Sequence, residues 1–429
     1  MKNNVKNLIE FIDHSPSCFH VIENARKQFL EHGFTELEEK EYWDLEEGKS
    51  YFVTRNGSSI IAFHLPKKDF QGFHIVASHS DSPTYRIKEQ PEMSVEKHYT
   101  KLNIERYGGM IPETWFDRPL SVAGRIIIEE NGQIKDQLVN VDRDLMIIPN
   151  LAIHMSRSSN ESKQLNPQKD LLPLCGGNLT KDGFEEMIAK ESGVEKEDIL
   201  SYDLFLYNRM RGTTLGINEE FVAAPKLDDL ECAYSSIEGM LNAKLSKDYV
   251  TVCAVFDNEE VGSGTKQGAG STFFPEVLKR ISYLCGKNEE EYYMAVADSF
   301  MLSADNAHAV HPNYQDKTDP TNRPYINEGI VLKYNASQKY TTDANSAALV
   351  KYLCKKEKIK CQVFFNRSDM LGGSTLGNIL TGQVSIKAAD IGLPQLSMHS
   401  TYETAGCKDL DDMITLMESF YELGKEVQI

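Results

Sequence analysis

The chain has 429 residues, of which 41% are hydrophobic and 26% charged, and its formal net charge is −18. Such a chain can bury a large core, and its length favours two domains or one domain with a large insertion. The acidic balance argues against nucleic acid as the main partner, because a nucleic-acid backbone calls for a basic face. We find neither a secretory signal at the start nor a stretch long enough to span a membrane. Eight cysteines without CxxC spacing fit buried reduced thiols, so we expect a cytoplasmic protein without a membrane partner.

The first part of the chain predicts one helix followed by three strands. Apolar residues recur at helical spacing over residues 19–29, and Gly33 marks the end of that helix. Strands are predicted over residues 51–54, 59–63 and 73–77. The first two are joined through Asn56-Gly57, a typical hairpin signal.

Residues 89–218 have a different character, with short strands, such as one over 122–129, and turns at Gly108-Gly109 and Asn131-Gly132. We interpret this part as an inserted β-rich domain. Residues 1–88 and 219–429 would then form one domain interrupted by the insertion.

Strands and helices alternate after Pro225. Helices are predicted over residues 229–245, 275–285, 343–357 and 409–425, and strands over 249–256, 292–297 and 361–365. This alternation predicts an α/β fold with a mainly parallel sheet covered by helices on both faces. The ligand site of such a fold lies beyond the C-terminal ends of the strands.

The most informative stretch is an apolar run from Val252 that ends in Glu259 and Glu260 and then in glycine. Two adjacent carboxylates at the end of a buried strand are unfavourable, because they repel each other and resist desolvation. A metal ion removes this penalty. One glutamate can bind the metal while its neighbour handles a proton.

Four other places along the chain put a potential metal ligand after a predicted strand or in a turn-rich loop. A single such residue is usually solvated or capping, but the recurrence favours one common site. His and carboxylate ligands suit a dinuclear site of the zinc type, in which one carboxylate bridges the ions and each ion takes one imidazole and one further carboxylate. The full set is His79 with Asp81, Asp228, Glu259 with Glu260, Asp305 and His399.

Three of these residues have a predicted role. Asp228 would be the bridge, Asp81 would orient the imidazole of His79, and Glu259 would take the proton from the attacking water.

Eight stretches of this sequence resemble the M18 family of metallo-aminopeptidases, the aspartyl aminopeptidase group. They run in family order over nearly the whole chain, and the stretches that begin at Asp257 and Asp305 together are highly specific. The stretches are Ser78-His-Ser-Asp-Ser-Pro, Trp115-Phe-Asp-Arg-Pro-Leu, Ile148-Pro-Asn-Leu-Ala-Ile-His, Pro225-Lys-Leu-Asp-Asp-Leu, Asp257-Asn-Glu-Glu-Val-Gly-Ser, Asp305-Asn-Ala-His-Ala-Val-His-Pro-Asn-Tyr, Gly372-Gly-Ser-Thr-Leu-Gly and Pro394-Gln-Leu-Ser-Met-His-Ser.

The resemblance implies two divalent metal ions per subunit, zinc first, with cobalt and manganese as alternatives. His79 and Asp305 would serve one ion and Glu260 and His399 the other, with Asp228 bridging and Glu259 as general base. The family also implies that the inserted domain is a dimerisation domain and that the chains form a tetrahedral dodecamer. His154 would reach a neighbouring subunit's active site, and its alternative role is that of a core or interface histidine.

The substrate implied by the resemblance is a peptide with an acidic N-terminal residue. Lys333 is the candidate for binding the acidic side chain, because the family has a lysine there, whereas a solvated surface lysine is the alternative. His308 and His311 lie beside Asp305 in sequence and suit substrate or oxyanion binding, or packing. Tyr340, Gly372 and Gly373 are further candidates for lining the pocket.

Two other functions stay open at this point. One is a different dinuclear hydrolase of the same architecture, such as a carboxypeptidase or deacylase, which often uses an arginine to bind a C-terminal carboxylate; Arg323 and Arg367 are unassigned. The other is a catalytically idle assembly or cargo protein. The complete ligand set argues against an idle protein.

Overall fold

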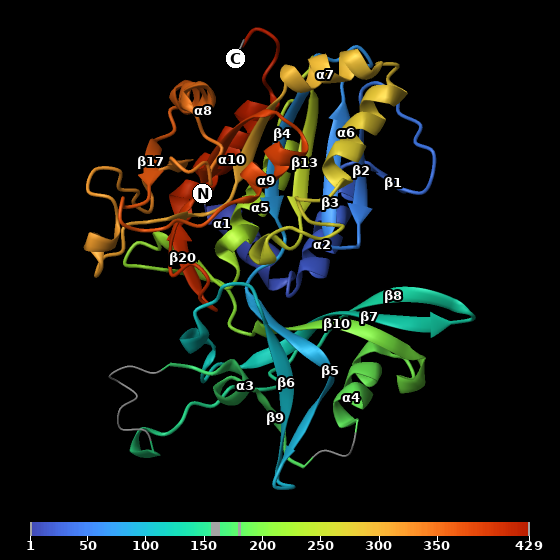
Figure 1. Cartoon of the computed structure of the whole chain (residues 1–429), viewed down its shortest axis with the longest axis vertical. Coiled ribbons are helices and arrows are strands. Elements are labelled where there is room, and N and C mark those ends of the chain that lie inside the picture. Colours follow the sequence, from blue (N-terminus) through green and yellow to red (C-terminus); the bar gives the residue numbers. More distant parts are fainter. Residues whose placement is uncertain (1, 156–163, 179–181, 428–429) are drawn as a thin grey trace.

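The computed structural model describes residues 2–155, 164–178 and 182–427. Figure 1 shows two lobes: an upper α/β lobe, which contains both ends of the described chain, and a lower lobe of long strands. The predicted α/β fold class is confirmed.

A mixed nine-stranded sheet forms the centre of the α/β lobe. Its four central strands are mutually parallel, and their apolar runs are buried on both faces, as expected for a sheet covered on both sides. The strand order is β1 (Thr35–Leu37), β2 (Lys49–Arg55), β3 (Ser59–Leu65), β13 (Val250–Phe256), β4 (Phe73–His79), β14 (Phe300–Ala304), β18 (Lys387–Gly392), β16 (Ile330–Tyr334) and β17 (Cys361–Phe365).

Helices cover both faces of this sheet, and each face has its own apolar core. The amphipathic helix that ends the fold packs mainly on α5, with its apolar side inward. One face carries α1 (Lys2–Asp13), α2 (Cys18–Glu31), α5 (Leu227–Asn242), α8 (Ala344–Glu357) and α10 (Cys407–Tyr421), and the other carries α6 (Phe273–Leu284), α7 (Glu289–Ala297) and α9 (Leu376–Gln383).

The lower lobe is a six-stranded sheet between Thr84 and Asn208, and we call it the inserted lobe. Its apolar core, from Tyr85 to Leu206, is separate from the two cores of the α/β lobe. The sequence placed this module at residues 89–218. Its strands are β8 (Gln133–Asn140), β7 (Leu120–Glu130), β10 (Ile199–Asn208), β5 (Thr84–Val95), β6 (Tyr99–Tyr107) and β9 (Leu174–Gly176), and its helices are α3 (Pro167–Asp170) and α4 (Gly183–Ser192).

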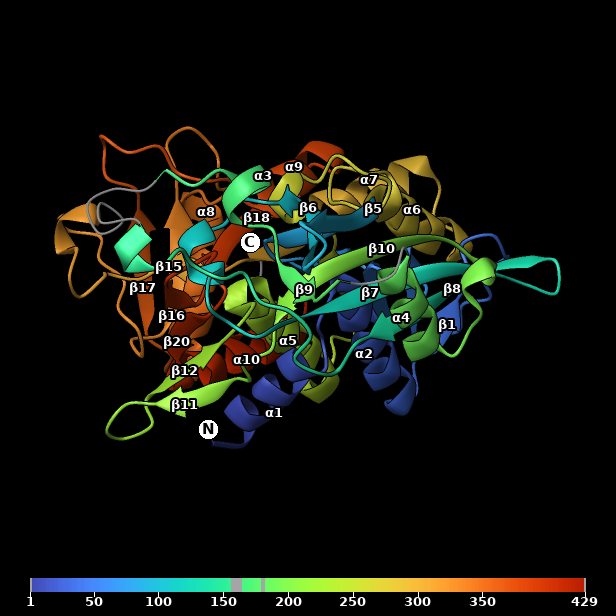
Figure 2. The same ribbon diagram turned by 90° about the horizontal axis from the view of Figure 1, so that it is seen from below.

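A small third sheet lies beside α1 and α10, and Figure 2 shows its strands β11, β12 and β20 next to these helices. It consists of β11 (Thr213–Leu215), β12 (Phe221–Ala224), β20 (Glu403–Gly406), β19 (Pro394–Leu396) and β15 (Ala307–His308).

One predicted strand is wrong. Residues 292–297 belong to helix α7, which begins with a capping box between Asn288 and Glu291. Tyr292, Ala295 and Val296 are buried at helical spacing, and this short aromatic run gave no clear period in the sequence. The strand of this region is β14, three residues further on.

The other predicted elements are present with shifted ends. The helix predicted to end at residue 245 ends at Asn242, and the last helix ends at Tyr421 instead of residue 425. Helix α1 was not predicted. Among the described residues, none of the helices combines the length and apolar character that crossing a bilayer requires.

Candidate active site

Three neighbouring parallel strands bring the first potential ligands to one edge of the sheet. His79 is the last residue of β4, Asp305 follows β14, and Glu259 and Glu260 follow β13. Asn258 adopts a left-handed conformation (φ 64°), which turns the chain out of β13 into a short 3-10 helix over Glu259–Val261. This turn directs the two glutamates to the carboxyl edge, as the sequence predicted.

Asp228 and His399 come from loops at the junction of the lobes. Asp228 follows β12 at the start of α5, after Lys226 in the left-handed region (φ 58°). His399 lies in the turn between β19 and β20 and is itself left-handed (φ 67°). These two loops face the strand ends.

The side chains of the predicted ligands meet in one cluster. Asp228 lies between the two imidazoles, with its Oδ1 3.6 Å from His79 Nε2 and its Oδ2 3.2 Å from His399 Nε2. Glu260 Oε1 is 3.4 Å from His399 Nε2. Asp228 is therefore the residue that the two halves of the cluster share.

Three groups of ligand atoms in this cluster lie within 4.8 Å of one another. The first contains His79, Asp228, Asp229 and Asp305, and the second Asp228, Glu260 and His399. The third contains His79, Glu259 and Glu260. Imidazole nitrogens and carboxylate oxygens are the ligands that zinc takes in hydrolytic sites.

Buried carboxylate oxygens without a partner support a cation at this place. Asp228 Oδ1 and Asp229 Oδ1 are buried and have no hydrogen-bond partner among the described residues. An unpartnered buried acceptor carries a large desolvation cost, which a metal ion would remove. The residues present therefore fit a metal-binding site.

The close approach of these carboxylates also shifts their pKa values. Burial, together with the nearby Asp305 and Asp81 carboxylates, raises the pKa of Glu259 to about 8. Burial and the Asp228 carboxylate raise the pKa of Glu260 well above its ordinary value. The pKa of Asp228 is lowered despite burial, because the imidazoles of His399 and His79 lie beside its carboxylate.

Asp81 supports both glutamates as well as His79. Its backbone oxygen lies 3.1 Å from His79 Nδ1, and its Oδ1 lies 3.4 Å from the same nitrogen. The carboxylate accepts hydrogen bonds from the backbone N–H groups of Glu259 (3.1 Å) and Glu260 (3.2 Å). Tyr107 of the inserted lobe donates to Asp81 Oδ2 over 2.6 Å, so both lobes hold this residue.

Two supporting acids were not predicted from the sequence. Asp229 Oδ2 accepts from the backbone N–H of His79 over 3.0 Å. Glu403 accepts from the backbone N–H groups of Asp228 (3.0 Å) and His399 (2.6 Å). Asp229 adjoins a predicted ligand, but nothing in the local pattern distinguishes Glu403 from a solvated acid.

A cavity of about 190 Å³ opens onto the cluster. Of the predicted substrate residues, His308, Lys333, Tyr340 and Gly373 line it. Lys333 is buried rather than solvated: its Nζ donates to Asp305 O (2.7 Å), Asp305 Oδ1 (3.3 Å) and Asn306 O (3.1 Å), and it lies 5.2 Å from the Tyr340 ring centre.

Other predicted residues lie elsewhere. His154 is exposed on a short 3-10 helix of the inserted lobe, and His311 packs on Tyr314 with ring centres 4.9 Å apart. Neither lines the cavity, and nor does Gly372. Arg323 donates to backbone oxygens of its own loop, and Arg367 pairs with Asp369.

The chain is similar in sequence to proteins named as M18 aminopeptidases. Residues 11–421 match the family described as "Aminopeptidase I zinc metalloprotease (M18)". A probable M18 family aminopeptidase 2 of Clostridium novyi is 45% identical, over 99% of this chain and 100% of that protein. The protein of the same name from Pseudomonas aeruginosa is 37% identical, over 96% of this chain and 97% of its own length.

Solved structures agree with this assignment. A chain in the cryo-EM structure of the Ape4 and Nbr1 complex has a TM-score of 0.95 and 37% identity, covering 98% of this chain and 85% of that one. The S. cerevisiae mApe1 dodecamer gives a TM-score of 0.85 at 26% identity, covering 98% and 97%. The family resemblance drawn from the sequence motifs is confirmed. The chain belongs to the M18 family and is a metal-dependent aminopeptidase, a peptide hydrolase.

Proposed function

We propose that this aminopeptidase binds two divalent ions, uses Glu259 as its general base and prefers acidic N-terminal residues. The observation that carries the proposal is the pair of ligand groups that share Asp228, with Glu259 beside them.

Each ion would have its own histidine. His79 and Asp305 would hold one ion and Glu260 and His399 the other, with Asp228 between them, and zinc is the first choice, before cobalt or manganese. When bound, such ions supply Lewis acidity to the scissile carbonyl and to the attacking water.

Glu259 would move the proton. Its carboxylate accepts a proton from the attacking water as the water oxygen bonds to the carbonyl carbon. As the carbon–nitrogen bond breaks, Glu259 gives that proton to the leaving amine. The hydrogen bonds from the backbone of Glu259 and Glu260 to Asp81 support this role, because they fix the turn that presents the carboxylate.

The acidic preference rests on Lys333. Among the described residues that line the active-site cavity, it is the one lysine or arginine. Its ammonium group is held between Asp305 and Asn306, which fixes a positive charge at the wall. Such a fixed charge would attract a substrate carboxylate more strongly than its neutral amide.

We also propose a homo-oligomer, with the dodecamer of the mApe1 structure as its form. The segment around His154 supports an interface, because Leu151, Ile153 and Met155 are 51%, 47% and 76% exposed. Exposed apolar side chains of this kind are typical of a surface that a partner covers. His154 would then reach a neighbouring subunit's active site.

The test is Glu259→Gln, assayed with a panel of aminoacyl-anilides and dipeptides in the presence of zinc, cobalt or manganese. We expect kcat to fall by about 10²–10⁴-fold while metal content is retained. Glu290→Gln, at an exposed position on α7, is the matched control and should leave kcat unchanged. Near-normal turnover in Glu259→Gln would reject Glu259 as the base.

The same panel distinguishes this proposal from a carboxypeptidase or deacylase. Peptides with a free N-terminus should be hydrolysed, and their N-acetylated counterparts should resist. Hydrolysis of the acetylated peptides at a similar rate would show that the free amine is not recognised.

A further inference from the structure

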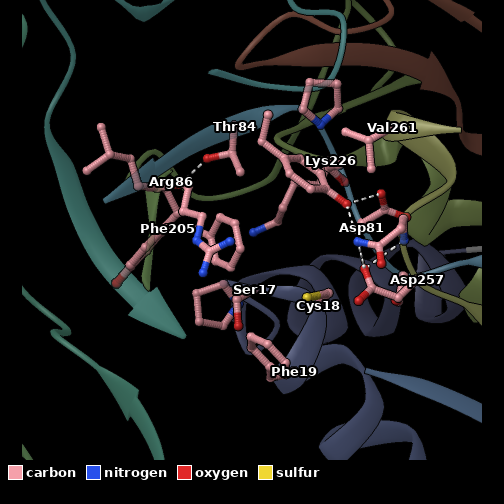
Figure 3. A pocket seen from close by; sticks show the side chains of 18 of the residues that line it. Ser17, Cys18, Phe19, Asp81, Thr84, Arg86, Phe205, Lys226, Asp257 and Val261 are labelled. Atoms are coloured by element: carbon pink, nitrogen blue, oxygen red, sulfur yellow. Dashed lines mark hydrogen bonds between the residues drawn. The ribbon is translucent and has the colours of Figure 1, made fainter. Parts of the chain in front are cut away.

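A cavity of about 440 Å³, distinct from the one that opens onto the ligand cluster, lies at the junction of the two lobes. Figure 3 looks into it: Ser17, Cys18 and Phe19 come from the α/β lobe, and Thr84, Arg86 and Phe205 come from the inserted lobe. The volume is within the usual range of small-molecule sites, and it exceeds that of the active-site cavity.

The walls of this interlobe cavity are largely aromatic and apolar. Phe19 on one lobe and Phe205 on the other both line it, with Trp115 and Val261. Tyr107, which is within 5.8 Å of the Phe205 ring centre, completes this surface. An apolar body of moderate size would find van der Waals contact on both sides.

Two of the cations in the wall are already paired. Arg86 and Arg125 bind the two oxygens of the same carboxylate, Asp203, at 2.7 Å and 3.0 Å. Arg125 also donates to the backbone oxygen of Asn56. These guanidinium groups therefore need no ligand to balance them.

Lys226 is different. It is half-buried and lines the cavity, yet among the described residues no carboxylate lies within 4.0 Å of its Nζ, and the amine makes no hydrogen bond. Its Nζ lies 6.0 Å from the centre of the Tyr207 ring. The charge of Asp13 acts on this amine from beyond that distance. A partly buried ammonium without a carboxylate in direct contact is unfavourable unless an anion joins it.

The wall also contains Lys266, which is exposed, and carboxylates that restrict what that anion can be. Asp81 and Asp257 lie on the wall beside Asn258, and both already accept hydrogen bonds from protein donors. They would repel a ligand that carries several negative charges, such as a phosphate. A single negative charge near Lys226, attached to an apolar body, fits the whole cavity.

We propose that the interlobe cavity binds a small organic monocarboxylate, with its carboxylate on Lys226 and its apolar or aromatic body between Phe19 and Phe205. The site is separate from the proposed peptide-binding cavity, although Asp228 borders both. The inference rests on the cavity and its charges and does not depend on the proposed function.

The probe is 3-phenylpropionate, with its neutral amide as the matched ligand, titrated by calorimetry into the full-length, metal-loaded protein. We expect the acid to bind about tenfold or more tightly than the amide, the ratio that one charge-assisted hydrogen bond provides. Lys226→Met should reduce the affinity for the acid to that for the amide, and Lys226→Arg should restore it. Lys190→Met, at an exposed position on α4, is the control and should change nothing.

A second variant tests the other lobe. Phe205→Trp fills the cavity from the inserted lobe and should abolish binding of both ligands, even if Lys226→Met were to unfold the protein. Binding should also persist after the metal is removed with a chelator. If the acid binds equally to Phe205→Trp, or if chelation abolishes binding, the carboxylate occupies the metal site and the proposal is wrong. Absence of binding to the wild-type protein would equally overturn it.

Discussion

Glu403 holds the backbone of Asp228: its Oε2 accepts the Asp228 N–H over 3.0 Å, and its Oε1 accepts from His399 over 2.6 Å. One buried carboxylate thus positions the shared residue of the cluster and a histidine from a different loop. Glu403→Gln replaces one acceptor with an NH₂ group that faces an N–H donor.

We therefore expect Glu403→Gln to weaken zinc binding by about 10–100-fold, the usual cost of losing a support of a metal ligand. Zinc affinity is measured by competition with a chromophoric chelator. Asp409→Asn is the control, because Asp409 is equally buried and accepts the N–H groups of Asn327 and Gly329 away from the cluster. Equal zinc affinity in Glu403→Gln and the wild type would contradict this role.

Lys333→Met should change substrate preference. Because Lys333 also holds Asp305, its loss will reduce turnover of every substrate, so the informative quantity is a ratio. We expect the ratio of kcat/KM for an N-terminal Glu substrate to that for its Gln analogue to fall by about tenfold. An unchanged ratio, with turnover lower for both substrates, would assign Lys333 to positioning Asp305 alone.

His154 can be tested by mixing two inactive variants. If His154 acts in a neighbouring subunit, assemblies formed from His154→Ala and Glu259→Gln chains regenerate complete sites. With random mixing, about a quarter of the sites should recover, because each site draws one group from each of two chains. Mixing Asp305→Asn with Glu259→Gln is the control, since both residues serve the same chain's site. No recovery in the first mixture would place His154 outside the neighbouring site.

The stability of the fold should depend on His74 in acid. His74 is buried in β4 and stacks on Tyr249 at 4.0 Å between ring centres, and its Nδ1 has no hydrogen-bond partner among the described residues. Burial lowers the pKa of His74 from 6.5 to about 3. Between these values the unfolded chain binds a proton that the folded chain does not.

The folded state therefore loses stability as pH falls below 6.5, by at most about 1.4 kcal/mol per pH unit from this group. His74→Phe keeps the stacking and removes the titration, so its stability relative to the wild type should rise between pH 6.5 and 4. Urea unfolding at several pH values measures this difference. His14→Gln, at an exposed position, should run parallel to the wild type.

The sequence predicted the candidate metal ligands from features that are visible locally. Glu259 and Glu260 end an apolar run, and His79 ends another, so parallel pairing was enough to predict that they meet. The change from the α/β lobe to the inserted lobe was also visible in the sequence, because short strands and turns begin there. The strand predicted over 292–297 failed because a short aromatic run fits both periods until its cap, Asn288, is considered.

The residues that support the ligand cluster could not be predicted from the sequence. Glu403 contacts Asp228, which is 175 residues away in the sequence, and Tyr107 contacts Asp81, which is 26 residues away. Both contacts depend on how the loops are placed. Whether Lys226 has an ion-pair partner likewise depends on three-dimensional distances. Neither composition nor spacing carries that information.

Tyr107 bears on how such a protein can be redesigned. Its hydroxyl, from the last residue of β6, donates to Asp81 and accepts from Asn258 Nδ2 over 2.8 Å. Excising residues 84–208 to make a minimal single-lobe enzyme would keep every predicted metal ligand yet remove this anchor from the turn that carries Glu259. The two lobes are therefore not interchangeable modules, and a graft of the insertion between relatives must transfer its tyrosine in the same register.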